Sequence, residues 1–245
     1  SRLYAGLAGE IREVAGIDIG YGATGGIIPC LGEDEFTQRS RMLDKLRAQT
    51  NDGYYPACML SVDELRAKLP KVPFGPAVTG AAWCDLDGYA NPLLLTFGLR
   101  KAFARSGGTF MPNGRVTEVR HEGGVYKAVT TDGIFEGDRL ALAAGLGVRA
   151  LAGQLGADVP VFPNRSQVLL LERIPQEVLP IPMLGIARTH GGTVMIGATH
   201  AHAAMNLDLV PENIADSGKW AVAVWPDLAK KRSIRFWSGL RVWPR

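Results

Sequence analysis

Segments with helical periodicity alternate along this chain with short strand-like runs, and glycine-containing turns separate several of the strands. An amphipathic helix and a half-buried strand each carry an apolar face, so this alternation restricts the fold to packed layers of helices and sheets. Gly123-Gly124 and Asp132-Gly133 are typical of tight turns between antiparallel strands. We therefore predict a mixed α/β (α+β) fold with one parallel sheet and one largely antiparallel sheet.

Capping residues and apolar spacing predict the helices. Residues 1–15 place apolar side chains on one helical face, and Gly16 is positioned as a C-cap. Ser61 and Glu64 form a capping-box pattern, and Asn91-Pro92 begins a helix with proline in its first turn. The buried stripe of that helix is predicted to comprise Leu95, Leu99, Ala102 and Phe103. Further helices are predicted over 32–50, around Leu151 and Leu155, and over 213–224.

Short apolar runs bounded by glycine, proline or polar residues predict the strands. The run 139–144 is apolar at nearly every position after its arginine, so we expect a buried strand that ends in the small residues Ala144 and Gly145. The other strands are predicted at 17–19, 27–30, 116–119, 126–130, 168–171, 193–196 and 234–237.

Composition narrows the classes of function. Apolar residues make up 47% of the 245 residues, enough for a buried core, and no apolar run reaches the roughly 20 residues that a membrane-spanning helix needs. The net charge is +3 with scattered lysines and arginines, so no nucleic-acid partner is predicted. Three cysteines without metal-ligand spacing favour free thiols, and hence a cytoplasmic location. A peripheral position at the inner membrane stays open.

Both ends of the sequence resemble positions inside a longer protein rather than natural termini. The sequence starts without methionine and within a helical pattern, and it stops on Trp243-Pro244-Arg245 directly after an apolar run. We therefore expect the chain to be the middle portion of a longer protein.

Seven short motifs follow one another over nearly the whole chain: Thr24-Gly25-Gly26, Asp87-Gly88 with Asn91-Pro92, Val116-x-x-Val119, Leu142-Ala143-Ala144-Gly145, Pro163-x-Arg165-x-Gln167, Ile196-Gly197-Ala198-Thr199 and Trp237-Ser238-Gly239-Leu240-Arg241. In this order they resemble the FAD-dependent D-amino-acid oxidase/glycine oxidase superfamily, the DAO family. Within that family, the sequence at 143–147, 167–169, 192–197 and 240–242 is most similar to the flavin subunits of opine oxidases, hydroxyproline dehydrogenases and hydrogen cyanide synthase.

The resemblance implies an FAD-binding Rossmann-like domain, present in part, and a substrate domain with a largely antiparallel sheet. The FAD-binding remnant is assigned to residues 1–16, 85–162 and 236–245, and the substrate-binding domain to residues 17–84 and 163–235. The family binds the FAD pyrophosphate at a Gly-x-Gly-x-x-Gly turn between a strand and a helix, and it covers the flavin with a later glycine-containing segment. We expect both to be absent, so that this chain alone holds FAD weakly or not at all.

The same resemblance nominates the site residues. Val116, Ala144 and Gly145 are expected to contact FAD, with core packing as the alternative for each. Arg241 is expected to bind the substrate carboxylate, and a structural ion pair is its alternative. His200 is expected on a polar pocket wall or an exposed loop, since His200 and His202 lack a third metal ligand. No catalytic acid or base is predicted. Arg165-Ser166-Gln167 stands where the family has an Arg-Gly-Gln turn, so a reshaped turn is expected.

Three functions are consistent with these residues. The first is FAD-dependent oxidation of the C–N bond of an amino acid, imino acid or opine-type secondary amine. The second is a catalytically inert substrate-domain fragment that binds at most a carboxylate. The third is one subunit of a hetero-oligomeric dehydrogenase whose cofactor segment comes from another polypeptide.

Overall fold

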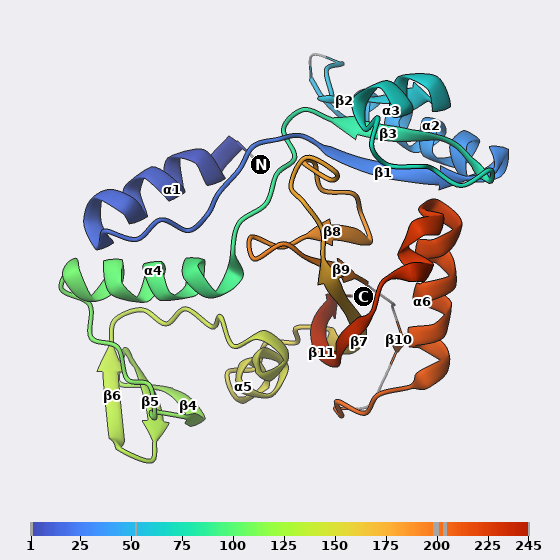
Figure 1. Ribbon diagram of the computed structural model, residues 1–245. Helices are drawn as coiled ribbons and strands as arrows, with labels where there is room; N and C mark the ends of the chain where they lie inside the picture. The colour runs from blue at the N-terminus through green and yellow to red at the C-terminus, as the bar shows by residue number, and fades with distance from the viewer. Residues whose placement is uncertain (1, 52, 198–200, 203–204, 245) are drawn as a thin grey trace. The chain divides into compact units, whose positions relative to one another are not determined.

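The computed structural model describes residues 2–51, 53–197, 201–202 and 205–244 (Figure 1), and only the backbone of residues 2, 201 and 202. The chain divides into two compact units. The larger unit comprises residues 1–108, 167–199 and 209–237, and the smaller unit comprises 109–166, 200–208 and 238–245. The two compact units do not show which residues bind the cofactor and which bind the substrate. The division into an FAD-binding domain and a substrate-binding domain therefore remains a prediction.

The larger unit contains most of the helices and two antiparallel sheets. Its elements are α1 (Arg2–Ala15), β1 (Gly26–Leu31), α2 (Glu33–Ala48), β2 (Ala57–Ser61), α3 (Val62–Lys68), β3 (Val78–Cys84), α4 (Pro92–Arg105), β8 (Ile186–Arg188), β9 (Thr193–Ile196), α6 (Pro211–Val224) and a 3₁₀ turn at Pro226–Lys230. The smaller unit contains β4 (Val116–Glu122), β5 (Val125–Thr130), β6 (Gly133–Gly137), a 3₁₀ turn at Gly145–Gly147, α5 (Val148–Gln154) and β10 (Ala201–His202). Two long strands, β7 (Val161–Arg173) and β11 (Ser233–Pro244), run through both units.

The two sheets of the larger unit meet at one chain segment. The first sheet has the order β1-β3-β2, and the second contains β7, β9 and β8 in that order. The Ile27 N–H of β1 donates to the Pro182 carbonyl at 3.0 Å, and the Leu184 N–H donates back to the Ile27 carbonyl at 2.7 Å. Side chains from both sheets and from α3 and α6 then form one apolar core, which includes Leu65, Met183 and Val224.

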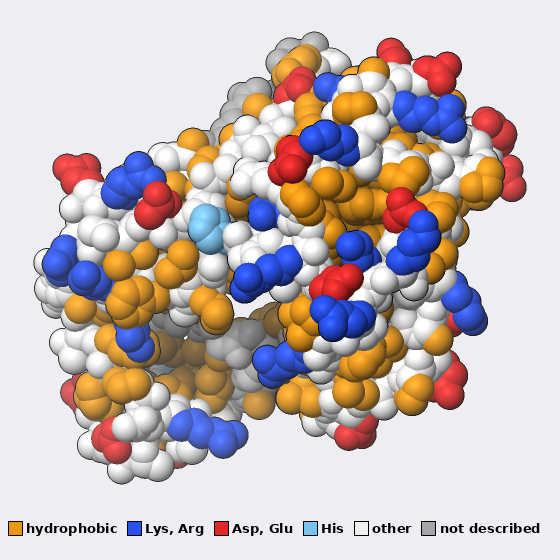
Figure 2. All heavy atoms as spheres, viewed as in Figure 1, with side chains coloured by type: hydrophobic (Ala, Val, Ile, Leu, Met, Phe, Trp, Pro, Cys, Tyr) orange, Lys and Arg blue, Asp and Glu red, His pale blue; other side chains and the backbone are white. Residues whose placement is uncertain are grey.

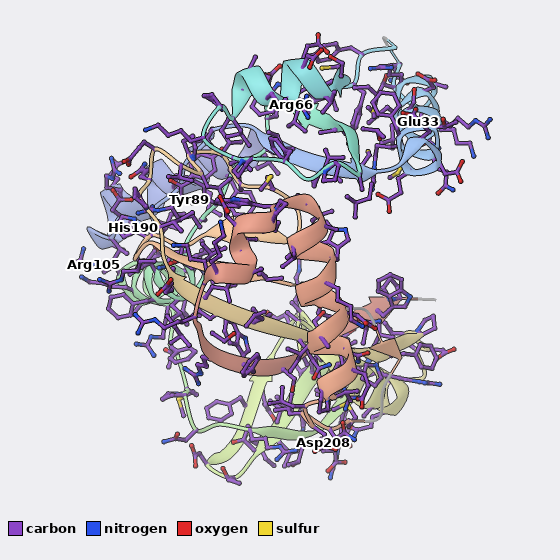
Figure 3. All side chains as sticks on the ribbon, turned by 45° about the vertical axis from the view of Figure 1, so that its right-hand side comes forward. Glu33, Arg66, Tyr89, Arg105, His190 and Asp208 are labelled. Atoms are coloured by element: carbon purple, nitrogen blue, oxygen red, sulfur yellow. The ribbon has the colours of Figure 1, made fainter. Side chains whose placement is uncertain are left out.

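Several predicted elements are confirmed where local residues determine them. The Ser61 hydroxyl accepts from the Glu64 N–H, the Glu64 carboxylate accepts from the Ser61 N–H, and α3 begins there. Glu33 lies in the first turn of α2, where acidic side chains favour the helix N-terminus (Figure 3). Gly123 and Gly124 adopt φ of +61° and +83° in the two-residue turn between β4 and β5. The mixed α/β architecture with largely antiparallel sheets is also confirmed.

The predicted buried stripe of α4 is wrong in part. Ala102 and Leu95 pack towards α1, but Leu99 and Phe103 are 42% and 51% exposed, and Figure 2 shows apolar side chains on the surface over this helix. The buried residue of α4 is Gly98. Because glycine has no side chain, α1 approaches α4 closely along that line and leaves the neighbouring apolar side chains in solvent.

Two predicted strands are not formed. At 17–19, the Asp18 carboxylate accepts from the Gly20 N–H at 2.9 Å, and this local turn competes with a strand ladder. At 139–144, the segment has no strand assignment, and no described strand pairs with it. The expected parallel sheet is not formed by the described pairings β1–β3, β2–β3, β4–β5, β5–β6, β7–β9, β7–β10 and β8–β9, which are antiparallel. An isolated bridge from Ile27 to Met183 is parallel.

The expected turn at Arg165-Ser166-Gln167 is replaced by continuous strand, since all three residues lie within the 13 residues of β7. Ser166 and Gln167 are buried at 5% and 1% exposure. In the larger unit, the Gln167 amide accepts from the Val210 N–H at 2.6 Å and donates to the Val210 carbonyl at 3.3 Å. An extended strand accommodates the serine side chain, and the glutamine connects β7 to the start of α6.

Candidate cofactor and substrate site

The first candidate cofactor contact, Val116, begins β4 in the smaller unit, beside a bulge. Val116 pairs with Thr130 of β5, and Glu118 pairs with Val129 of β5, so Thr117 is the extra residue of β4. A bulge locally redirects the strand and its main-chain groups. Helix α5, which follows the second candidate segment, lies beside β4 (Figure 1).

The second and third candidates, Ala144 and Gly145, precede α5 through the 3₁₀ turn. Gly145 has φ of +56°, a conformation that favours glycine, and a Cβ added there would lie 3.8 Å from Val242 Cγ2. Ala144 and Gly145 are both exposed, so their main chain is open to a ligand. This open, small-residue backbone fits a cofactor that is contacted through main-chain groups.

The two candidate cofactor segments are joined by the side chain of Gln154, at the end of α5. The Val119 N–H of β4 donates to Gln154 Oε1 at 2.7 Å, and Gln154 Nε2 donates to the Thr117 carbonyl at 3.4 Å. The structure therefore brings β4, which starts at Val116, together with the helix that follows Gly145. Sequence reasoning missed Gln154, because glutamine is an ordinary helix residue and its partners lie 35 and 37 residues away.

The candidate carboxylate anchor, Arg241, lies on β11 directly before Val242, whose Cγ2 would lie 3.8 Å from a Cβ added at Gly145. Its side chain is exposed, and it makes no ion pair with a carboxylate among the residues that the structure describes. The structural ion pair considered as its alternative therefore has no partner in the described part of the chain. His200 lies outside the described residues.

The backbone around the candidate anchor is tied to a neighbouring loop in the smaller unit. Ser238 Oγ of β11 donates to the Leu207 carbonyl. Arg165 Nη1 of β7 donates to Asn206 Oδ1 at 2.5 Å. These two contacts hold residues 206–207 against both long strands, and this loop follows the segment that contains His200.

The Gly-x-Gly-x-x-Gly spacing is not absent from the sequence, and that expectation needs correction. Gly20, Gly22 and Gly25 follow it, between α1 and β1. The segment leads into a strand rather than a helix, so it lacks the helix N-terminus that binds pyrophosphate in a dinucleotide fold. Its glycines instead make room for aromatic rings. A Cβ would lie 2.1 Å from the ring of Trp83 at Gly25, and 2.9 Å from the ring of Tyr89 (Figure 3) at Gly22.

Among the described residues, the remaining reactive side chains form no second site. Burial raises the pKa of the Cys30 and Cys84 thiols above their ordinary value, which keeps them protonated. His190 is exposed in the turn between β8 and β9 (Figure 3). Within the described ranges, no three His, Cys, Asp or Glu residues are grouped as a metal site. No helix of the described chain has the length and apolarity needed to cross a bilayer.

The DAO family, described as FAD dependent oxidoreductase, matches this chain over residues 1–245. The chain therefore belongs to the DAO family of FAD-dependent oxidoreductases, and the predicted resemblance is confirmed. It is 28% identical over 243 residues to an opine oxidase subunit of Agrobacterium tumefaciens, covering 99% of this chain and 64% of that relative. It is 31% identical over 183 residues to the hydrogen cyanide synthase subunit HcnC of Pseudomonas protegens, covering 72% of this chain and 43% of that relative.

The fold agrees with a solved structure of the same family. Glycine oxidase from Geobacillus kaustophilus superimposes with a TM-score of 0.87 at 24% sequence identity, covering 100% of this chain and 65% of that chain. The described strands and helices thus have the arrangement of a DAO-family flavoenzyme. The chain spans slightly less than two thirds of the length of such relatives.

Proposed function

We propose that the protein containing this chain is an FAD-dependent oxidoreductase that oxidises the C–N bond of an amino acid, imino acid or opine-type secondary amine. One observation carries the proposal beyond family membership. The Gln154 hydrogen bonds and the Gly145–Val242 approach bring Val116, Ala144-Gly145 and the strand of Arg241 together within one compact unit. When bound, FAD supplies the electron acceptor for this oxidation.

The main chain at Val116 and at Ala144-Gly145 is proposed to hold part of FAD. Exposed small residues support this role, because no side chain projects between the ligand and the backbone. The donors for the pyrophosphate are not supplied by the Gly20–Gly25 segment, which leads into a strand. We therefore expect residues 1–245 alone to bind FAD weakly, and the whole protein or its assembly to bind it tightly.

Arg241 is proposed to bind the carboxylate of the substrate and so to orient the amine-bearing carbon. A guanidinium presents paired N–H donors that match the two oxygens of a carboxylate. An exposed arginine without an ion-pair partner among the described residues is available for such a ligand. His200, which lies outside the described residues, is proposed as a second substrate-binding residue.

The protein is further proposed to act as one subunit of a larger enzyme. The relatives from Agrobacterium tumefaciens and Pseudomonas protegens are both named as subunits. We also retain the assignment of residues 1–16, 85–162 and 236–245 to an FAD-binding domain and of residues 17–84 and 163–235 to a substrate domain. A cytoplasmic location is proposed from the three free cysteines.

The test is performed on the full-length protein, purified together with any subunits that accompany it. Bound flavin is identified by its absorbance spectrum and by chromatography after release. The oxidised protein is then mixed anaerobically with amino acids, imino acids and opines, and with 2-hydroxy acids as a control class. We expect loss of the oxidised-flavin absorbance with at least one amine and with none of the hydroxy acids. Absence of flavin would refute the proposal and favour the inert carboxylate-binding alternative. Reduction by hydroxy acids only would also refute it, because the protein would then oxidise a C–O bond rather than a C–N bond.

A further inference from the structure

We infer that Gln154 is a positioning residue for the cofactor: its side-chain amide fixes the distance between the β4 contact at Val116 and the contact at Ala144-Gly145. The inference rests on the proposed FAD function. It concerns a residue that has no place among the motifs of the sequence and that sits at the end of α5, away from the predicted contacts themselves.

The Gln154 amide makes hydrogen bonds to the unpaired edge of β4, beside the bulge at Thr117. On its other side, β4 pairs with β5, and Thr117 is the extra residue of the bulge. Gln154 Oε1 accepts from the Val119 N–H at 2.7 Å, and Nε2 donates to the Thr117 carbonyl at 3.4 Å. One side chain thereby engages a donor and an acceptor on either side of Glu118, which fixes the register of α5 against the bulge.

Helix α5 and the turn Gly145–Gly147 before it are expected to move together as one rigid segment of the smaller unit. Helix α5 starts at Val148, directly after the turn Gly145–Gly147, so a shift of the helix also shifts Gly145. Ala152 is 2% exposed, and the Arg149 guanidinium lies 4.9 Å from the centre of the Phe162 ring on β7. Movement of α5 relative to β4 is therefore limited mainly by packing and by the Gln154 hydrogen bonds.

Loss of the amide has a defined consequence. Val119 is 2% exposed, so its N–H would lose its hydrogen-bond partner in a buried position unless water entered or α5 moved. Either response changes the spacing between Val116 and Gly145. A ligand that contacts both segments binds more tightly when their spacing is already fixed, because less ordering remains to be done on binding.

The test compares FAD affinity among three variants of the full-length protein, after flavin has been removed and titrated back. Gln154→Met keeps the length of the side chain and removes both hydrogen bonds. Gln154→Glu keeps the acceptor for Val119 and removes the donor to Thr117. Gln167→Met is the matched control, because Gln167 makes the same kind of paired contact to Val210, in the larger unit. Thermal unfolding of each flavin-free variant is recorded alongside.

We expect Gln154→Met to raise the Kd for FAD by about tenfold or more at a temperature where the protein is fully folded, with Gln154→Glu intermediate. Gln167→Met should lower the melting temperature but change the Kd by less than about threefold. A Gln154→Met protein that binds FAD within about threefold of the unmodified protein would overturn the inference. Should that variant not fold, the same threshold applies to Gln154→Glu. Failure of the unmodified protein to bind FAD would instead overturn the proposed function, and this inference with it.

Discussion

Gly98 of α4 is in such close contact with Ile11 of α1 that a Cβ added at Gly98 would lie 2.6 Å from Ile11 Cγ2. The same added atom would lie 3.4 Å and 3.5 Å from side-chain carbons of Ile17 and Ile19. Ile11 and Ile19 are 2% and 0% exposed, so these side chains have little room to move. One glycine thus determines how closely the two helices pack.

Gly98→Ala should therefore destabilise the protein, although alanine favours helix more than glycine does. We expect a loss of about 1–3 kcal/mol in the free energy of unfolding, as for other overpacked sites. Gly218→Ala in α6 is the matched control, because no atom lies within 4 Å of its added Cβ, and it should be neutral or stabilising by up to about 1 kcal/mol. Denaturant unfolding measures both, and equal effects of the two substitutions would contradict the packing account.

The ion pair between Glu172 and Arg232 should make stability depend on pH in the acid range. Arg232 donates to Glu172 Oε2 at 3.0 Å and, with Lys231 nearby, holds the pKa of Glu172 below its ordinary value of 4.5. A carboxylate whose pKa is lower in the folded state stabilises the fold above its unfolded pKa, and this contribution is lost as pH falls through the folded pKa. The ion pair therefore contributes at neutral pH and is lost below 4.5.

Glu172→Gln should remove that part of the acid dependence. In denaturant unfolding from neutral pH to about pH 3, the variant should lose less stability than the unmodified protein. Glu177→Gln replaces a nearby exposed glutamate outside the ion pair and should leave the pH dependence unchanged. Parallel pH profiles for the unmodified protein and Glu172→Gln would show that the pair makes no difference.

Local sequence predicted the elements that local residues specify. Ser61 with Glu64, Asn91 before Pro92, and Gly123-Gly124 each satisfy or bend the backbone within a few residues, and all three lie where they were predicted. The strand 193–196 was predicted with its observed ends for the same reason, since a turn at Gly191-Gly192 precedes it.

Distant contacts determined what the sequence could not predict. Apolar spacing on α4 could not show that Gly98 would be the contact with Ile11, which leaves Leu99 and Phe103 exposed. The apolar run 139–144 has strand character, but a strand assignment needs a neighbour to pair with. At the candidate site, the motifs nominated Val116, Gly145 and Arg241, whereas Gln154 emerged only from hydrogen bonds formed across the fold.

Arg241→Leu should weaken the apparent affinity for a carboxylate-bearing amine by about tenfold or more, or about 1.4 kcal/mol. Leucine removes both the charge and the paired donors, whereas Arg241→Lys keeps a charge and should recover only part of the affinity. The measurement is substrate-dependent flavin reduction in the full-length protein, with Arg235→Leu on the same strand as the matched control. An Arg241→Leu affinity within about threefold of the unmodified value would exclude the anchor role.

The central claim, FAD-dependent oxidation of a C–N bond, is tested most directly by counting products in a single anaerobic turnover. The full-length protein with its bound FAD is mixed with the amine that reduces it, and the carbonyl product and released amine are quantified after quenching. For an open-chain amine, one carbonyl product and one released amine are expected for each flavin reduced, since the oxidised C–N bond is hydrolysed in water. For a cyclic imino acid, one product that carries both the new carbonyl and the amine is expected. Flavin reduction without oxidation of the carbon beside the nitrogen would contradict the claim.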